Sequence, residues 1–147
     1  NQINHMDSTS NDFYITGVQL EVGTEATPFE HRSIGQELAL CQRYYQKQTA
    51  GTNQYSIFLT GSIDTTSNIY LYGKLNGTMR TSPSFATANT YLYTQPGGTL
   101  TYSSTSNRSG PEVASINFGT ISGGTQGYGI RFESNAGNGY VEFDAEL

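Results

Sequence analysis

The end of the chain decides the fold, because residues 127–147 read GYGIRFESNAGNGYVEFDAEL. Apolar and polar residues alternate in both halves of this stretch, as they do in β-strands that bury one face. Ile130 and Phe132 fall on one face of the first half, together with Tyr128. In the second half one face carries Val141, Phe143, Ala145 and Leu147. We therefore predict two strands here.

The opposite face of the last strand is acidic. It carries Glu142, Asp144 and Glu146, spaced about 7 Å apart. A hairpin turn at residues 135–138 would set Arg131 opposite Glu142. Carboxylates at this spacing suit a glycoside hydrolase or, with further oxygen ligands, a Ca²⁺ site. We favour a solvated face that Arg131 partly neutralises, and predict neither a catalytic residue nor a metal ligand.

The region 51–147 repeats this pattern, with turn clusters rich in Gly, Asn and Pro about every ten residues. Residues 103–111, which contain Arg108, are expected to form a long polar loop. The candidate strands are 54–63, 67–75, 85–94, 99–103, 113–118, 127–134 and 139–147. Short strands at this spacing predict a mainly β domain, an antiparallel β-sandwich or small barrel.

We predict a linker at residues 33–50 that contains a single helix, over residues 33–48. Ser33 is a good N-cap and Gln36 holds the capping-box position. The helix would carry an apolar seam with 4-3-4 spacing, made of Ile34, Leu38, Cys41 and Tyr45. Such a short helix is marginal alone in water, so the seam either docks on a sheet or meets copies of itself in an oligomer.

Residues 1–32 contain one further strand candidate, because residues 13–22 read FYITGVQLEV. The alternation slips at residues 16–17, as it does at a β-bulge. The strand would be the last one of an upstream jelly-roll domain, or it would pair with another chain or with the C-terminal sheet. We favour the first alternative.

Composition excludes several classes of partner. The chain has 147 residues and a net charge of −5, with only seven Lys and Arg in total. No basic stripe is present to neutralise phosphates, which argues against nucleic acid. No apolar run approaches the ~20 residues of a membrane-spanning helix, so membrane insertion is not expected.

The inventory of reactive side chains argues against an enzyme. His5 and His31 are the only histidines, and Cys41 is the only cysteine. Cys41 lies on the apolar seam of the predicted helix, so a Cys–His nucleophile pair has no support in the sequence. The ligand cluster that a metal needs is also missing, and we predict no cofactor.

Several stretches resemble a known group of proteins. Residues 15–23 (ITGVQLEVG) and 26–32 (ATPFEHR) resemble the end of a carbohydrate-binding-module-like jelly roll in bacteriophage tail and virion proteins. Residues 37–47 (ELALCQRYYQK) resemble the helix that follows it there. Residues 79–83 (MRTSP) and 143–147 (FDAEL) are similar to landmarks of the C-terminal domain of the same proteins.

This resemblance implies the distal piece of a phage tail fibre, on the extracellular virion surface. Such proteins are usually homotrimers whose tips contact host-surface polysaccharide or protein. The resemblance brings no defined catalytic set. It also makes the helical seam a candidate oligomer interface.

Tyrosines are the leading candidates for ligand contacts. Tyr70 and Tyr72 share one strand face, and Tyr91 and Tyr93 share another. Exposed tyrosine rings stack on the apolar faces of sugars, although the same rings also serve core and trimer packing. We add Arg108 as a candidate contact from the polar loop.

The sequence therefore predicts a fibre-tip module for recognition of a host glycan and for trimerisation. Two alternatives stay open. One is a purely structural trimer-assembly module, and the other is a fragment of a polysaccharide depolymerase that uses the acidic strand.

Overall fold

The computed structural model describes residues 14–52, 55–95, 98–119, 121–134 and 137–146. His5, Phe13 and Leu147, which the sequence analysis named, lie outside these ranges. The chain forms two units, residues 1–33 and residues 34–147. Within the described residues, no helix has the length and apolar character needed to cross a membrane.

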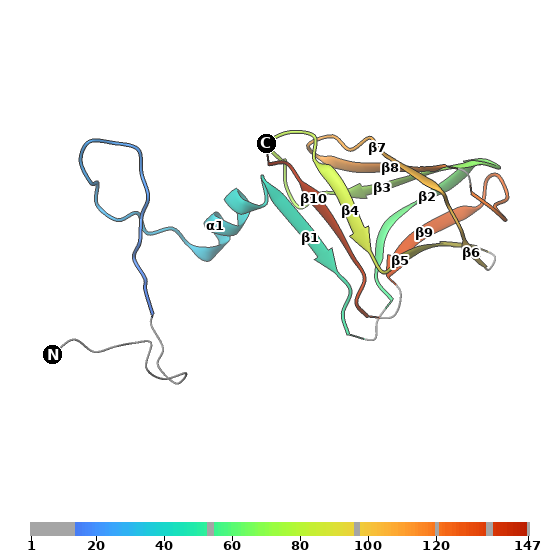
Figure 1. Cartoon of the computed structure of the whole chain (residues 1–147), viewed down its shortest axis with the longest axis horizontal. Coiled ribbons are helices and arrows are strands. Elements are labelled where there is room, and N and C mark those ends of the chain that lie inside the picture. The colour runs from blue at the N-terminus through green and yellow to red at the C-terminus, as the bar shows by residue number, and fades with distance from the viewer. Residues whose placement is uncertain (1–13, 53–54, 96–97, 120, 135–136, 147) are drawn as a thin grey trace. The chain divides into compact units, whose positions relative to one another are not determined.

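The second unit contains one helix followed by strands, which confirms the predicted mainly β class (Figure 1). The elements are α1 (Ile34–Cys41), β1 (Tyr45–Thr49), β2 (Ile57–Thr65), β3 (Asn68–Lys74), β4 (Ser84–Ala88), β5 (Thr90–Thr94), β6 (Gly98–Leu100), β7 (Ser104–Asn107), β8 (Val113–Gly119), β9 (Gly129–Ser134) and β10 (Tyr140–Asp144). Each strand that was predicted within residues 51–147 overlaps at least one of these.

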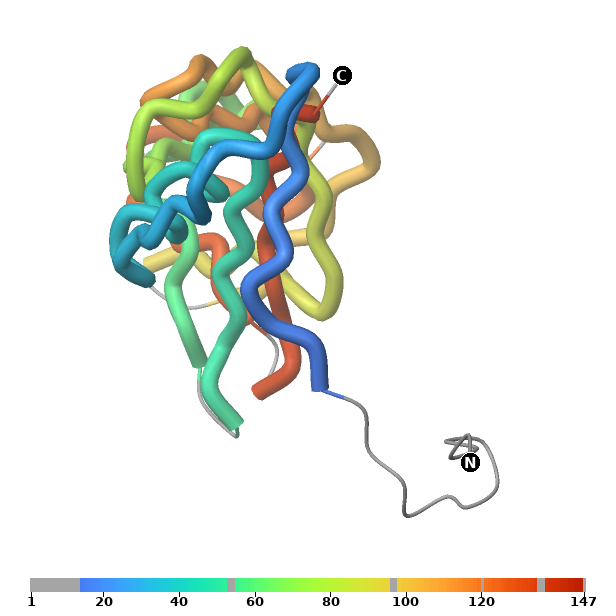
Figure 2. The backbone as a smooth tube through the Cα atoms, turned by 90° about the vertical axis from the view of Figure 1, so that its left-hand side faces the viewer, coloured from blue at the N-terminus to red at the C-terminus, as the bar shows by residue number. Residues whose placement is uncertain are grey.

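The strands form two antiparallel sheets. A three-stranded sheet has the order β1-β10-β4, and a curled seven-stranded sheet has the order β6-β5-β9-β2-β3-β8-β7. Figure 2 shows β10, in red, running between β1, in turquoise, and β4, in yellow-green.

The core lies between the two sheets and inside the curl of the larger one. The rings of Phe85 on β4 and Phe132 on β9 are 6.4 Å apart, so an aromatic contact joins the two sheets. Within the larger sheet the rings of Phe118 and Phe132 are 5.1 Å apart. Phe118, Phe132 and Phe143 are fully buried. The predicted alternation is confirmed for residues 130, 132, 141, 143 and 145, because all five side chains are buried. Tyr128, which was predicted on the same face as Ile130, is exposed.

The chain changes sheets at a corner that the sequence pattern does not show. The predicted strand 85–94 is two strands, because Asn89 has a left-handed φ of 51° that ends β4 and starts β5 in the other sheet. Gly139 lies against this corner. A Cβ atom on Gly139 would sit 2.5 Å from the backbone oxygen of Asn89, so only glycine fits there.

The predicted terminal hairpin is wrong. β9 pairs with β2 and β5, whereas β10 pairs with β1 and β4 in the other sheet. Arg131 faces Thr60 and Tyr93 across its two neighbouring strands and does not face Glu142. Alternation assigns the faces of a strand but not its partners. At the end of β9 the fully buried Ser134 bonds to the backbone of Ser56, which holds β9 beside β2.

The helix is shorter than predicted, and its last predicted turns form a strand. α1 ends at Cys41, and Tyr45 begins β1, paired with Asp144 of β10. The buried side chain of Gln46 fixes this arrangement. It accepts a hydrogen bond from the Asn76 backbone N–H at 2.8 Å and donates to the carbonyl of Gln42 at 3.0 Å.

The predicted loop 103–111 also contains a strand. β7 pairs with β8 at the edge of the larger sheet, and each of its residues is exposed. The amide of Asn107 donates to the carbonyl of Pro83 at 2.6 Å. A polar edge strand carries no buried face, and this is why its sequence resembles a loop.

The first unit is an extended segment that turns back on itself. Gln19 accepts a hydrogen bond from the backbone N–H of Glu30 at 2.8 Å, and Glu21 accepts one from that of Thr27 at 2.6 Å. The described part of the predicted strand, residues 14–22, has no ladder of backbone hydrogen bonds. Its apolar residues, Val18 and Leu20 among them, are exposed. Whether it completes an upstream domain stays a prediction.

Candidate functional site

A row of aromatic, hydroxyl and cationic residues crosses the outer face of the seven-stranded sheet. The strand registers align its members directly, from β5 through β9, β2 and β3 to β8. The backbone N–H of Arg108, just beyond β7, donates to the carbonyl of Ser115 at 2.8 Å and extends the row by one position. We call this set the tyrosine row: Tyr93, Arg131, Thr60, Tyr72, Ser115 and Arg108.

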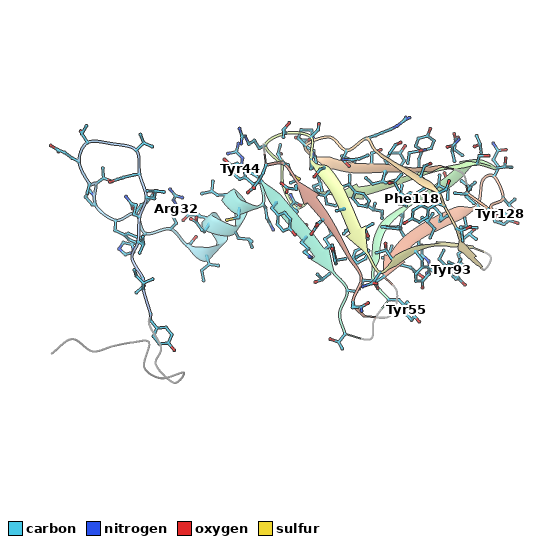
Figure 3. All side chains as sticks on the ribbon, viewed as in Figure 1. Arg32, Tyr44, Tyr55, Tyr93, Phe118 and Tyr128 are labelled. Carbon is cyan, nitrogen blue, oxygen red and sulfur yellow. The ribbon has the colours of Figure 1, made fainter. Side chains whose placement is uncertain are left out.

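The row faces outward because its members alternate with core residues. Leu59, Leu71 and Phe132, each adjacent in sequence to a member of the row, are buried. Figure 3 labels Tyr93 on the outside of the sheet and Phe118 in the interior.

Two arginines of this face lie over tyrosine rings. The guanidinium carbon of Arg131 is 4.9 Å from the centre of the Tyr93 ring, and that of Arg108 is 5.6 Å from the centre of the Tyr70 ring. At these distances the positive charge is attracted to the ring face. Tyr93 and Tyr70 therefore orient the two guanidinium groups.

Tyr72 has a different environment. It lies between Thr60 and Ser115 in the registers, and 53% of its surface is exposed. Tyr70, Tyr91 and Tyr93 are only partly exposed. Of the four predicted tyrosines, Tyr72 is thus the one most open to a ligand.

Tyr91 lies on the same sheet face, two positions from Tyr93 on β5 and near one end of the row. It lies opposite Glu133, which is only 5% exposed and pairs with Arg131 at a distance of 3.5 Å between Nε and the carboxylate. Burial, followed by the hydrogen bond to Glu133, raises the pKa of Tyr91 to about 12. Tyr91 is therefore a neutral donor that holds Glu133, and Glu133 in turn holds Arg131.

The structure brings the five predicted ligand contacts onto one sheet face. They are Tyr70, Tyr72, Tyr91, Tyr93 and Arg108. Three residues that were not predicted as contacts share this face with them: Arg131, Thr60 and Ser115. The alternation of residues in β9 predicts that Arg131 points away from the core. The residues beside Arg131 depend on which strands pair, and the sequence pattern does not predict that.

The acidic strand lies on the other sheet and is engaged with its own neighbours. Glu142 accepts a hydrogen bond from the Tyr45 hydroxyl at 2.7 Å and pairs with Lys47 at 3.4 Å. This hydrogen bond raises the pKa of Tyr45. Asp144 accepts from the backbone N–H of Glu146 at 2.8 Å. The predicted neutralisation by Arg131 is wrong, because Lys47 occupies that role. Among the described residues, no group of three or more His, Cys, Asp and Glu side chains could hold a metal ion.

The predicted helical seam is only partly formed. Ile34 and Leu38 lie on α1 and are 87% and 55% exposed, and Cys41 at its end is exposed as well. Tyr45 belongs to β1 and is therefore not part of the helical seam. No residue of α1 is buried, so the alternative that the seam docks on a sheet of this chain is wrong.

Comparison with protein-family models, with curated proteins and with solved structures gave no match for this chain. We therefore infer function from the geometry of the two sheets and of α1.

Proposed function

We propose that this chain recognises a host-surface glycan through the tyrosine row, as a module at the tip of a phage tail fibre. The observation that carries the proposal is the exposed Tyr72 ring, set between the hydroxyls of Thr60 and Ser115 and flanked by two oriented arginines.

The chemistry of this face suits sugars better than other ligand classes. An exposed tyrosine ring packs against the apolar face of a sugar ring while its hydroxyl stays hydrated. Hydroxyl and guanidinium groups beside it match the many donors and acceptors of a sugar. Small apolar ligands prefer concave and mostly apolar pockets, and an open sheet face of this kind offers them little burial.

The resemblance of residues 15–47 to the tail-fibre linker region supports the virion and extracellular part of the proposal. The low charge content, 13% of residues, fits a surface that meets hydrated polysaccharide through hydroxyl and aromatic groups.

Binding of the intact chain to immobilised capsular and O-antigen polysaccharides tests the proposal. We expect saturable binding to at least one of them. A chain that binds none of them does not have the proposed function.

A second function, assembly of the fibre, is supported by α1. Ile34 and Leu38 lie four positions apart, and so share one face of the helix. Both are exposed, so this face is available to a second and third copy of the chain. We propose that the helices of a homotrimer meet there. The depolymerase alternative is less well supported, because Glu142 is engaged by Tyr45 and Lys47.

A further inference from the structure

We infer that the tyrosine row selects acidic polysaccharides, with a sugar ring packed on Tyr72 and sugar carboxylates bound by the guanidinium groups of Arg108 and Arg131. This inference rests on the proposed glycan-binding function and names its ligand class.

The distribution of charge is the first step of the argument. The chain holds twelve acidic and seven basic residues. Three of the seven basic residues are on or beside this one face, since Lys74 follows Tyr72 by two positions on β3 and is exposed. An acidic protein that collects cations on one face presents that face to an anionic ligand.

The acidic residues near the row balance only part of this charge. Glu112 lines the same pocket as Lys74, at the end of β3. Glu133 is buried and already paired with Arg131, so its carboxylate is not presented to solvent. Asp64 lies on β2 four positions beyond Thr60, toward the end of the strand. Arg131 and Arg108 therefore hold row positions on either side of Tyr72, and Glu133 balances part of the charge of Arg131.

The second step is the geometry of the arginines. A guanidinium group that lies over a tyrosine ring keeps its N–H edge available for hydrogen bonds. Such an edge binds a carboxylate through two parallel N–H···O bonds. Because Tyr70 and Tyr93 already orient Arg108 and Arg131, little side-chain freedom is lost when a carboxylate binds.

The third step is the length of the row. The guanidinium groups lie over Tyr93 on β5 and Tyr70 on β3, and these strands are three spacings apart, roughly 14 Å along the sheet at ~4.8 Å per strand. In the strand registers Tyr72 lies between the backbone positions of the two arginines. A single sugar cannot reach both arginines, so the ligand is a chain with carboxylates on either side of the stacked ring.

Matched pairs of probes test the inference. The intact chain is titrated with fragments of polysaccharides that contain uronic acid or sialic acid, and with the same fragments after reduction of their carboxyl groups. Fragments of neutral polysaccharides are included. We expect carboxyl reduction to weaken binding at least about tenfold, the loss typical of one charge-assisted hydrogen-bonded contact.

Arg108→Gln is the test variant and Arg80→Gln is its control. Both arginines are exposed and lie over a tyrosine ring at similar distances, 5.6 Å to Tyr70 and 5.7 Å to Tyr44, but only Arg108 belongs to the tyrosine row. We expect Arg108→Gln to lose about tenfold in affinity for the acidic fragment and to bind the reduced fragment as the wild type does. Arg80→Gln should match the wild type with both.

Three results would overturn the inference. Equal affinity for acidic and reduced fragments, or binding to neutral glycans alone, removes the selectivity and leaves the proposed function intact. If Arg108→Gln binds the acidic fragment as tightly as the wild type does, the acidic ligand does not bind at the tyrosine row. Absence of binding to every fragment would contradict the proposed function as well.

Discussion

Tyrosines of one sheet face perform different tasks because their neighbours differ. Tyr72 is exposed, whereas Tyr70 and Tyr93 lie under guanidinium groups and Tyr91 donates to a buried carboxylate. The residue type and its parity in the strand predict which face a tyrosine occupies. They do not predict its task, which depends on residues 38 or more positions away, such as Tyr70 and Arg108 or Tyr93 and Arg131.

Tyr91 makes stability depend on pH in the alkaline range. Its pKa in the folded protein, about 12, lies above the ordinary value of 10, so the neutral phenol contributes stability that is complete below pH 10. That stability is lost as the pH rises from 10 to 12, since the unfolded chain ionises first. The difference in unfolding free energy between wild type and Tyr91→Phe should therefore shrink over this interval, as measured by urea denaturation. A difference that stays constant would contradict the assignment.

Asn89 supplies a second residue-level prediction. Its φ of 51° lies in the left-handed region, which β-branched residues avoid. Asn89→Val should cost about 1–2 kcal/mol of unfolding free energy. Asn89→Gly is the matched control, since both changes remove the side-chain bond to the carbonyl of Asn138, and it should cost less than Val. Urea midpoints measure both. Equal losses of unfolding free energy in the two variants would contradict this explanation, because the left-handed backbone conformation would then not account for the cost of valine.

At the scale of elements, the sequence predicted the strands well and their partners poorly. Alternation identified the buried faces of β9 and β10, because burial of a face is local information. The pairing of β10 with β1 comes from contacts about a hundred residues apart, and a turn-like 135–138 segment suggested a hairpin instead. The same long-range pairing overrode the helical spacing at Tyr45.

Helix α1 carries the element-level prediction. Leu38→Asp should leave the unfolding free energy of the β-domain within about 0.5 kcal/mol of the wild type, because Leu38 is exposed. It should also dissociate any oligomer, because a charge on the shared apolar face opposes helix contact. Light scattering coupled to size exclusion measures the mass of both proteins. The wild type should be a trimer and the variant a monomer.

Glu37→Gln is the control for this change, since Glu37 is on the same helix and is polar already. It should keep the mass of the wild type. A wild-type chain that is monomeric at micromolar concentration, or a Leu38→Asp variant that remains trimeric, would contradict assembly through α1.

At the scale of the second unit, the two sheets present different outer faces. On the three-stranded sheet, Glu142 is engaged by Lys47 and by the hydroxyl of Tyr45. The seven-stranded sheet presents an exposed aromatic ring with arginines on both sides. This difference is the reason that we propose recognition by the larger sheet. It could not be read from the sequence, because it depends on which strands share a sheet.

Isothermal titration of two tyrosine variants with a polysaccharide fragment that binds the wild type tests this assignment most directly. Tyr72 on the larger sheet and Tyr45 on the smaller one are 53% and 41% exposed, so either alanine substitution removes an accessible ring with little effect on the core. We predict that Tyr72→Ala weakens binding about tenfold, or ~1.4 kcal/mol. Tyr45→Ala should bind as the wild type does. Unchanged affinity in Tyr72→Ala, or a comparable loss in Tyr45→Ala, would contradict recognition by the tyrosine row.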